Sequence, residues 1–418
     1  RLRAATAAAG RILVARLPVY PVWARNCARW QDPGVAPHVL RLADASGYLR
    51  EDPWSPGANT IPKSFASNPN LKPDPAIEAI VSRACRGETL SEDDIVRLFE
   101  ARDVDVEYIC AEADRLRRQV CGDTVTYVVN RNINYTNICQ YKCGFCAFSK
   151  GKTHEALRGR PYDLDVAEVV RRSIEAQARG ATEVCLQGGI HPHYTGETYL
   201  ALVRAIRAAL PDMHIHAFSP LEVAHGAATL GVSIETYLRE LKAAGLDTLP
   251  GTAAEILDDE VRAVLCPDKI DSAQWLHVVE TAHRLGLRTT ATIMFGHVDA
   301  PRHWARHLLH IRALQARTGG FTEFVPLPFV HQEAPIALRG NARKGPTFRE
   351  VRLMHAVARL ALHPLITNIQ ASWVKLGPIG IRICLDGGVN DVGGTLMNES
   401  ISRAAGSQHG QEMPPRSM

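Results

Sequence analysis

The stretch TYVVNRNINYTNICQYKCGFCAF, residues 126–148, begins as a predicted β-strand and ends in a loop with three closely spaced cysteines. Residues 126–134 are rich in β-branched and aromatic side chains, which favours a strand. The loop that follows holds Cys139, Cys143 and Cys146. This strand is the first of a series of alternating strands and helices, so the cysteine loop lies at one defined end of the predicted sheet.

The sequence beyond this stretch predicts an α/β fold with a parallel (β/α) barrel. Further strands are expected at 183–186, 213–218, 247–249, 288–295, 323–327, 366–371 and, as an eighth, 381–385. Helices are expected between them at 166–179, 197–209, 233–244, 257–264, 271–285, 301–317 and 346–362. In such barrels functional groups gather at the C-terminal ends of the strands, so the loops there are the expected site.

The residues before the barrel differ in composition. Residues 17–23 contain two prolines and are expected to be extended, because proline biases its predecessor away from the helix. Short helical pieces are expected at 35–47. Residues 52–70 hold four prolines and a glycine, which is typical of a linker.

The barrel is expected to carry an N-terminal helical extension. Residues 74–118 have a helical pattern, with Ser91 as the N-cap of one helix, and should pack outside the barrel. The predicted domains are residues 1–60, a linker at 61–74 and the barrel domain at 75–418.

Composition excludes several classes of protein. Among 418 residues, 48 Lys and Arg stand against 44 Asp and Glu, and a net charge of +4 is too small to indicate nucleic-acid binding. No run of 18 apolar residues is present, so no membrane span is predicted. Seven of the ten cysteines are scattered, which does not suit a secreted disulfide framework and favours a reducing compartment, the cytoplasm.

The three clustered cysteines have the spacing C-x3-C-x2-C. Random placement of ten cysteines would produce this triplet about 0.006 times. A cubane iron–sulfur cluster normally takes four thiolates, so three would leave one iron open to another ligand. Three alternatives stay open: chance burial, a zinc site with a remote fourth ligand, and an electron-transfer cluster with a distant fourth cysteine.

Other polar groups follow the second and third predicted strands. Gln187 precedes the pair Gly188 and Gly189, which would let a ligand approach the backbone, although a plain tight turn explains them too. Ser219 and Glu222 lie after the third strand, where Glu222 is either an amine-binding or proton-transferring acid or a solvated loop residue.

The later strands end in further candidates. Thr252 and Glu255 suggest either a capping box for the next helix or a ligand role. His297 follows the fifth strand and is either a functional group or a satisfied structural histidine. Asp391 lies in a glycine-rich run, 386–394, that is expected to be a loop after the last strand.

Several of these motifs together resemble the radical S-adenosylmethionine (SAM) enzymes of deazaflavin and futalosine-pathway menaquinone biosynthesis. The resemblance covers about residues 75–412. It rests on residues 132–148, 187–192, 216–220, 250–254 and 390–396.

The resemblance implies a [4Fe–4S] cluster on Cys139, Cys143 and Cys146, whose open iron binds SAM. An electron from that cluster would yield a 5′-deoxyadenosyl radical, and the barrel would be of the radical SAM, TIM-type class. Residues implied to contact the cofactor are Phe145, Gln187, Gly188, Gly189, Ser219 and Glu222. Candidates for catalysis are His216, His297 and Asp391.

Within these enzymes the chain is most similar to the tyrosine-using halves of 7,8-didemethyl-8-hydroxy-5-deazariboflavin synthases. That implies transfer of the 4-hydroxybenzyl group of L-tyrosine to 5-amino-6-(D-ribitylamino)uracil, with no nucleic-acid or membrane partner. Residues 1–60 resemble the end of the cyclising half, so the chain looks like a piece of a longer protein that lacks the cyclisation step. The alternatives are a futalosine-type enzyme and a non-catalytic iron–sulfur or zinc protein.

Overall fold

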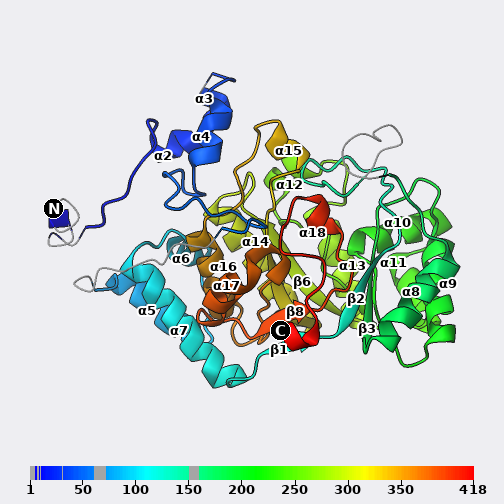
Figure 1. The fold of residues 1–418 in the computed structure, drawn as a ribbon. Coiled ribbons are helices and arrows are strands. Elements are labelled where there is room, and N and C mark those ends of the chain that lie inside the picture. The colour runs from blue at the N-terminus through cyan, green and yellow to red at the C-terminus, as the bar shows by residue number, and fades with distance from the viewer. Residues whose placement is uncertain (1–4, 7–8, 10, 31, 61–71, 150–159) are drawn as a thin grey trace.

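A computed structural model of the protein describes residues 5–6, 9, 11–30, 32–60, 72–149 and 160–418. Six parallel strands form one sheet, and their order in the sheet follows their order in the chain. Helices pack around the outer side of this sheet (Figure 1). The strands are β2 (Asn130–Asn134), β3 (Glu183–Gln187), β4 (His214–His216), β5 (Thr248–Leu249), β6 (Arg288–Phe295) and β7 (Phe321–Pro328).

The sheet continues beyond β7 through weaker links. Isolated bridges join Ile369 to β7 and Gln370 to β8 (Asp391–Gly394), and β8 pairs in parallel with β1 (Thr126–Val128). Because β1 leads directly into β2, these links bring the sheet round to its first strand. The predicted α/β barrel is confirmed, with the expected seventh strand reduced to two bridges.

The helices that follow the strands occupy nearly the predicted ranges. After β2 and β3 they are α8 (Val166–Ala178) and α9 (Gly196–Ala209). Between β4 and β7 lie α10 (Pro220–Leu230), α11 (Ile234–Ala244), α12 (Asp259–Leu265), α13 (Ser272–Arg284) and α14 (Pro301–Thr318). The C-terminal part contains α15 (Pro335–Leu338), α16 (Phe348–Leu362), α17 (Trp373–Leu385), α18 (Ile401–Ala404) and the 3₁₀ turn η1 (Pro415–Ser417).

The predicted helical extension packs on the outside of the barrel. It consists of α5 (Pro75–Cys85), α6 (Glu92–Phe99) and α7 (Val104–Cys121), which contact α14 and α16. Ser91 caps α6 as predicted, because its Oγ accepts a hydrogen bond from the Asp94 N–H at 3.1 Å. Short helices α2 (Pro21–Arg25), α3 (Cys27–Trp30) and α4 (Ala36–Leu42) precede this extension.

Two predictions at the C-terminal end of the barrel are wrong. Residues 381–385, expected as a strand, form the end of α17, since a short apolar run has no periodicity that separates strand from helix. The strand is the glycine-rich 391–394, expected as a loop. A Cβ on Gly394 would lie 2.1 Å from Oδ1 of Asn130, so this strand needs glycine to pass its neighbour.

Three local predictions also fail. The segment 17–23 is not extended throughout, because Pro21 begins α2 at a position where its missing N–H costs nothing. Helix α10 has no counterpart among the expected helices. Thr252 and Glu255 form no capping box: α12 begins after the cap Asp258, and Glu255 instead pairs with Lys269 at 2.8 Å.

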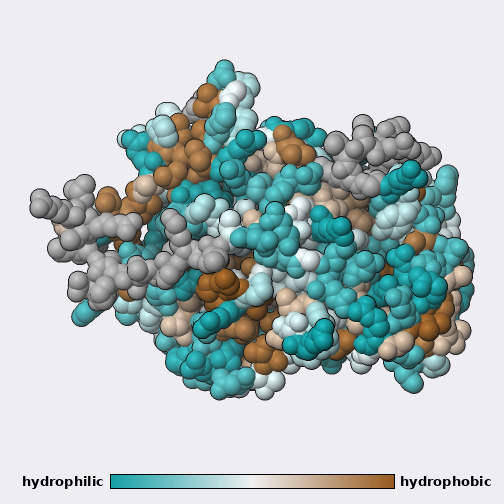
Figure 2. All heavy atoms as spheres, viewed as in Figure 1, coloured by the Kyte–Doolittle hydropathy of each residue, from teal (hydrophilic) through white to brown (hydrophobic). Residues whose placement is uncertain are grey.

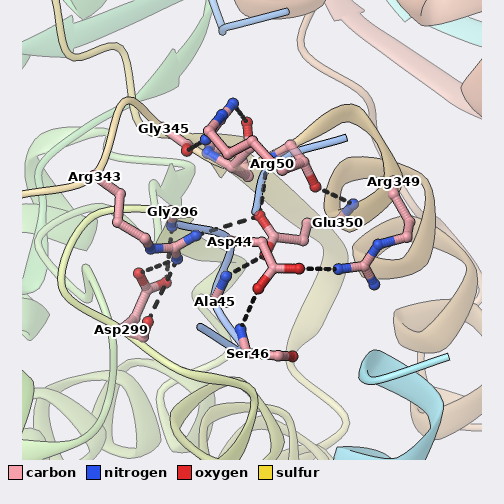
Figure 3. Close-up of polar contacts among 12 residues, drawn as sticks. Asp44, Ala45, Ser46, Arg50, Gly296, Asp299, Arg343, Gly345, Arg349 and Glu350 are labelled. Carbon is pink, nitrogen blue, oxygen red and sulfur yellow. Dashed lines mark hydrogen bonds and ion pairs between the residues drawn. The ribbon is translucent and has the colours of Figure 1, made fainter. Parts of the chain in front are cut away.

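A buried ionic network attaches the segment before α5 to the barrel (Figure 3). The Asp44 carboxylate accepts hydrogen bonds from Arg102 at 2.5 Å and from Arg349 at 3.0 Å. Glu350, on α16, accepts the Ala45 N–H at 2.6 Å. Burial by itself would raise the pKa of Asp44, but Arg349 and Arg102 outweigh burial and hold that pKa below its usual range.

Arg343 extends the network to the loop after β6. Its guanidinium pairs with Asp299 at 3.0 Å and with Glu350 at 3.3 Å. Trp54 is 1% exposed and lies edge-on to Phe348 of α16, so apolar packing joins the same two regions. Ala45 and Trp54 therefore belong to the core of the barrel. No helix in the described part of the chain combines the length and apolarity needed to cross a membrane.

We predict that Asp44→Asn lowers the free energy of unfolding by about 3–5 kcal/mol, because it leaves Arg102 and Arg349 buried without their shared carboxylate. Urea denaturation followed by circular dichroism measures the change. Because its pKa is lowered, Asp44 is ionised at neutral pH and the stabilisation is fully present there. The stabilisation is lost as the pH falls through the lowered pKa of Asp44.

The matched control is Asp123→Asn. The Asp123 carboxylate is 86% exposed in its contacts with Arg117 and Arg118, so we expect a change below about 1 kcal/mol. Equal effects of the two substitutions would contradict a special role for the buried network.

Candidate functional site

A cavity of ≈ 710 Å³ occupies the inside of the barrel. The interior of a (β/α) barrel is ordinarily filled by layers of inward-facing side chains. Here it is lined by polar side chains of every strand in the six-stranded sheet, together with the cysteine loop. The cavity therefore reaches from the C-terminal mouth, where the loops lie, down to the strand starts.

Cys139, Cys143 and Cys146 lie at the mouth of the cavity, in the loop after β2. All three are free, half-buried thiols. The Ile190 N–H lies 3.4 Å from Sγ of Cys139 and donates to it, and the Ser149 N–H donates to Cys146 Sγ at 3.4 Å. These backbone donors face the sulfurs, which suits thiolates that hold a metal group.

The cysteine loop is held by its neighbours on two other loops. The Gly144 N–H donates to the Leu265 carbonyl at 2.7 Å, and the Gly144 carbonyl accepts the Ile336 N–H at 2.7 Å. The loop is therefore clamped between the end of α12 and the start of α15.

Burial raises the pKa of Cys139 and raises that of Cys143 to about 12, although Lys269 opposes the second shift. Metal ligation requires thiolates, so a bound cation would displace these protons. Lys269 is the nearby cation: its Nζ lies 5.1 Å from the Phe145 ring centroid and pairs with Glu255.

The spacing of the three sulfurs favours a cluster over a single ion. Among the described residues, two groups of potential ligands have atoms within 4.8 Å of one another, and neither contains these cysteines. A tetrahedral zinc ion holds its sulfurs about 3.8 Å apart, as follows from a Zn–S bond of about 2.3 Å. In an iron–sulfur cubane each thiolate binds a different iron, so wider spacing fits.

The glycine pair after β3 packs directly against the cysteine loop. A Cβ on Gly188 would lie 2.3 Å from the Tyr135 ring, and one on Gly189 would lie 2.2 Å from the Ile138 carbonyl oxygen. The Gly189 N–H also donates to the Thr136 carbonyl at 2.9 Å. Close packing of two loops thus requires both glycines, and with Gln187 they line the mouth of the cavity.

Ser219 and Glu222 form a buried capping box at the start of α10. The Glu222 carboxylate accepts the Ser219 N–H at 2.7 Å and also the Tyr135 hydroxyl. Glu222 is 2% exposed, which excludes a solvated loop residue. Burial raises its pKa, while hydrogen bonds from Ser219 and Tyr135 lower it. Both residues line the cavity beside the glycine pair.

The remaining candidates divide between the cavity and the surrounding core. Phe145, His216 and Asp391 line the cavity. His297 lies outside the lining and is fully buried: its Nε2 contacts the Met294 carbonyl at 2.9 Å, and its Nδ1 accepts the Val298 N–H at 2.8 Å. Its hydrogen bonds match the structural alternative for His297.

The sequence prediction omitted several polar side chains deep in the cavity. Glu183, Thr248 and Glu323 line it, far from the loops that the barrel rule selects. His214 and Gln370, which the sequence placed on the face of one strand and after another strand, line it as well. The sequence does indicate such polar groups, because strands buried on both faces are normally continuous apolar runs. The sequence His214-Ile-His216 interrupts such a run with inward-facing polar groups.

Comparison with known proteins finds matches to two consecutive regions of the chain. The family model described as "Radical SAM superfamily" matches residues 133–311, and "CofH/MqnC C-terminal region" matches 318–414. A 5-amino-6-(D-ribitylamino)uracil–L-tyrosine 4-hydroxyphenyl transferase of Methanopyrus kandleri is 52% identical over 303 residues, 72% of this chain and 81% of that protein.

The chain is also similar to longer proteins and to a solved structure. An FO synthase of Mycobacterium tuberculosis is 46% identical over 98% of this chain and 52% of its own length, so the chain spans about half of that relative. The crystal structure of methylornithine synthase superposes with a TM-score of 0.59 at 18% identity, covering 76% of this chain and 86% of that one. The latter likeness concerns the fold alone.

We predict that Gly189→Ala lowers the iron content of anaerobically reconstituted protein to less than half of that of the unmodified chain. The added Cβ would meet Ile138 and the Cβ of Cys139, 2.9 Å away, and push the first thiol out of place. Iron and sulfide analysis measures the loss. Gly387→Ala is the control, since its Cβ would meet nothing closer than 3.4 Å; equal iron loss in both variants would contradict the packing argument.

Proposed function

This chain belongs to the radical SAM superfamily and ends in the CofH/MqnC C-terminal region, and on that premise we propose that it transfers the 4-hydroxybenzyl group of L-tyrosine to 5-amino-6-(D-ribitylamino)uracil. The observation that carries the proposal is the 52% identity to the Methanopyrus kandleri transferase, of which the chain covers 81%. The product belongs to the deazaflavin route toward coenzyme F-420.

We assign a [4Fe–4S] cluster to Cys139, Cys143 and Cys146, with SAM on the iron that lacks a protein ligand. When bound, the cluster supplies the electron that cleaves SAM to a 5′-deoxyadenosyl radical. The chain supplies position: two neighbouring loops clamp the cysteine loop, and Gly189 packs against Cys139.

The cavity walls beside the cysteines would hold the cofactor. Gln187, Gly188 and Ser219 face the same mouth as the cysteines, and Phe145 lies within the cysteine loop itself. Glu222 links two walls, since it caps α10 and accepts the Tyr135 hydroxyl. We assign to these residues the placement of SAM, and to the enclosed barrel the exclusion of water from the reaction.

We propose that residues 1–60 are the end of a preceding cyclising half. The long FO synthases match 98% of this chain, whereas the single transferase matches 72%. Half of the large exposed apolar side chains among the described residues lie between Ile12 and Leu42, and Figure 2 shows hydrophobic surface over this region. Such a surface is typical of a segment that packs against another domain. The predicted linker at 61–74 lies outside the described residues up to residue 71.

The principal competitor is a futalosine-pathway enzyme, since the matching C-terminal model covers both CofH and MqnC. The sequence identity to the tyrosine transferase favours the transfer reaction over the futalosine pathway. An assay with the substrates of each reaction distinguishes the two functions. An iron–sulfur cluster is oxygen-sensitive and its ligands must stay reduced, so we place the protein in the cytoplasm.

We predict that anaerobically reconstituted protein consumes SAM and forms the coupled product only when both L-tyrosine and the diaminouracil are present. Cys143→Ala should lower product formation by at least about 10³-fold, because one iron of the cluster loses its thiolate. Mass spectrometry of the product and the effect of SAM on the electron paramagnetic resonance spectrum measure the two properties.

Cys85→Ala is the control for thiol removal, because Cys85 lies on α5 and does not line the cavity. It should retain full activity. Product formation by Cys143→Ala would contradict the cluster assignment, and one stoichiometric zinc without iron would exclude radical chemistry.

A further inference from the structure

The deep end of the cavity carries a group of polar side chains that the cofactor assignment leaves unused. We call Glu183, His214, His216, Thr248 and Glu323 the polar floor. Glu183 and His214 are register partners at the starts of β3 and β4, and His216 is the partner of Thr248 on β5. Gln187, at the mouth, is four residues or about 13 Å further along β3 than Glu183, and His216, the partner of Cys185, lies about halfway between them.

The two histidines of the floor share one hydroxyl. Thr248 Oγ1 lies 2.8 Å from His214 Nε2 and 2.7 Å from His216 Nδ1. A threonine hydroxyl has a single hydrogen, so it donates to one ring and accepts from the other. On each ring, one nitrogen does not contact Thr248. That nitrogen is an N–H on one histidine and carries a free lone pair on the other. The pair thus offers one donor and one acceptor.

Carboxyl groups flank the histidines on both sides. Glu183 accepts a hydrogen bond from Asn130 Nδ2 at 2.9 Å, and Glu323 accepts one from Gln370 Nε2 at 3.0 Å. Burial, with Asp391 nearby, raises the pKa of Glu323, which favours its protonated, hydrogen-donating form. Within the described residues no lysine or arginine forms an ion pair with these carboxyl groups.

The hydrogen-bond donors and acceptors of the polar floor determine which kind of ligand fits it. With no described lysine or arginine paired to its carboxyl groups, the floor offers no cation for a phosphate or carboxylate to bind. An apolar ring would leave the floor's donors and acceptors unpaired, which is unfavourable in a buried site. A chain of hydroxyls satisfies both kinds of partner, because each hydroxyl donates one hydrogen bond and accepts others.

We propose that the polar floor binds the ribityl chain of the diaminouracil substrate. This inference rests on the proposed function. The reacting carbon of the uracil must face the mouth beside the cysteine loop, so the non-reacting chain extends toward the strand starts. Contacts to such a remote part of a substrate hold its reacting part in position.

A divalent cation is the competing occupant. Ligand atoms of Glu183, His214 and His216 lie within 4.8 Å of one another. However, Nε2 of His214 and Nδ1 of His216 both contact the Thr248 hydroxyl, and Glu183 accepts a hydrogen bond from Asn130. Hydroxyl recognition uses these hydrogen bonds as they are, whereas a cation on those two nitrogens would have to displace Thr248.

The test is anaerobic calorimetric binding of two probes to the reconstituted full chain in the presence of SAM. One probe is 5-amino-6-(D-ribitylamino)uracil, and the other is 5,6-diaminouracil, which lacks the chain. The unmodified protein should prefer the first. Thr248→Val and Glu183→Gln should each weaken its binding about tenfold and leave 5,6-diaminouracil and L-tyrosine within about twofold. Thr236→Val, an exposed threonine on α11, is the control and should change nothing.

The outcomes separate this inference from the proposed function. If the unmodified chain forms coupled product but both floor variants bind the ribityl probe normally, or lose both probes equally, the polar floor is not the ribityl site. Weaker tyrosine binding alone would assign the floor to the other substrate and overturn the inference. A stoichiometric divalent ion lost in Glu183→Gln would overturn it in favour of a metal. Failure of the unmodified chain to bind or convert the diaminouracil would instead refute the proposed function.

Discussion

Alternation of side chains along the parallel strands is the constraint on which the rest of this structure depends. In β4, Ile215 points outward and is fully buried in the helical layer, while His214 and His216 point into the barrel. In β6, Ile293 is buried outside while Thr292 faces the cavity. Each strand therefore contributes apolar packing to the shell and polar groups to the interior. The barrel is held together from outside, which leaves its interior free for ligands.

The shell is reinforced where the chain before the barrel joins it. Asp44 pairs with Arg102, which lies between α6 and α7, and with Arg349 of α16. Glu350 accepts the Ala45 N–H and pairs with Arg343 (Figure 3). Every member of this network is a charge removed from water, so its value depends on complete pairing. The result is that Ala45 and Trp54, which precede α5, belong to the core of the barrel.

The mouth and the floor of the cavity are built by different interactions. At the mouth, close loop packing places the cysteines, since Gly189 can approach Ile138 only without a side chain. At the floor, hydrogen bonds between strands orient the polar groups, as when Thr248 engages two histidines of β4. A rigid mouth suits a cofactor that must stay in one position, and a polar floor with oriented donors and acceptors suits a hydrophilic substrate.

Local sequence was sufficient for the features that depend on near neighbours. The cysteine spacing, the glycine pair, the Ser91 cap and most strands and helices could be predicted from it, because spacing, turn chemistry and periodicity are local. It was insufficient where distant residues decide: 391–394 became a strand through pairing with β1, and 381–385 a helix through packing. The polar floor likewise exists only because curvature of the sheet turns Glu183, His214 and Glu323 toward one space, which no stretch of chain specifies alone.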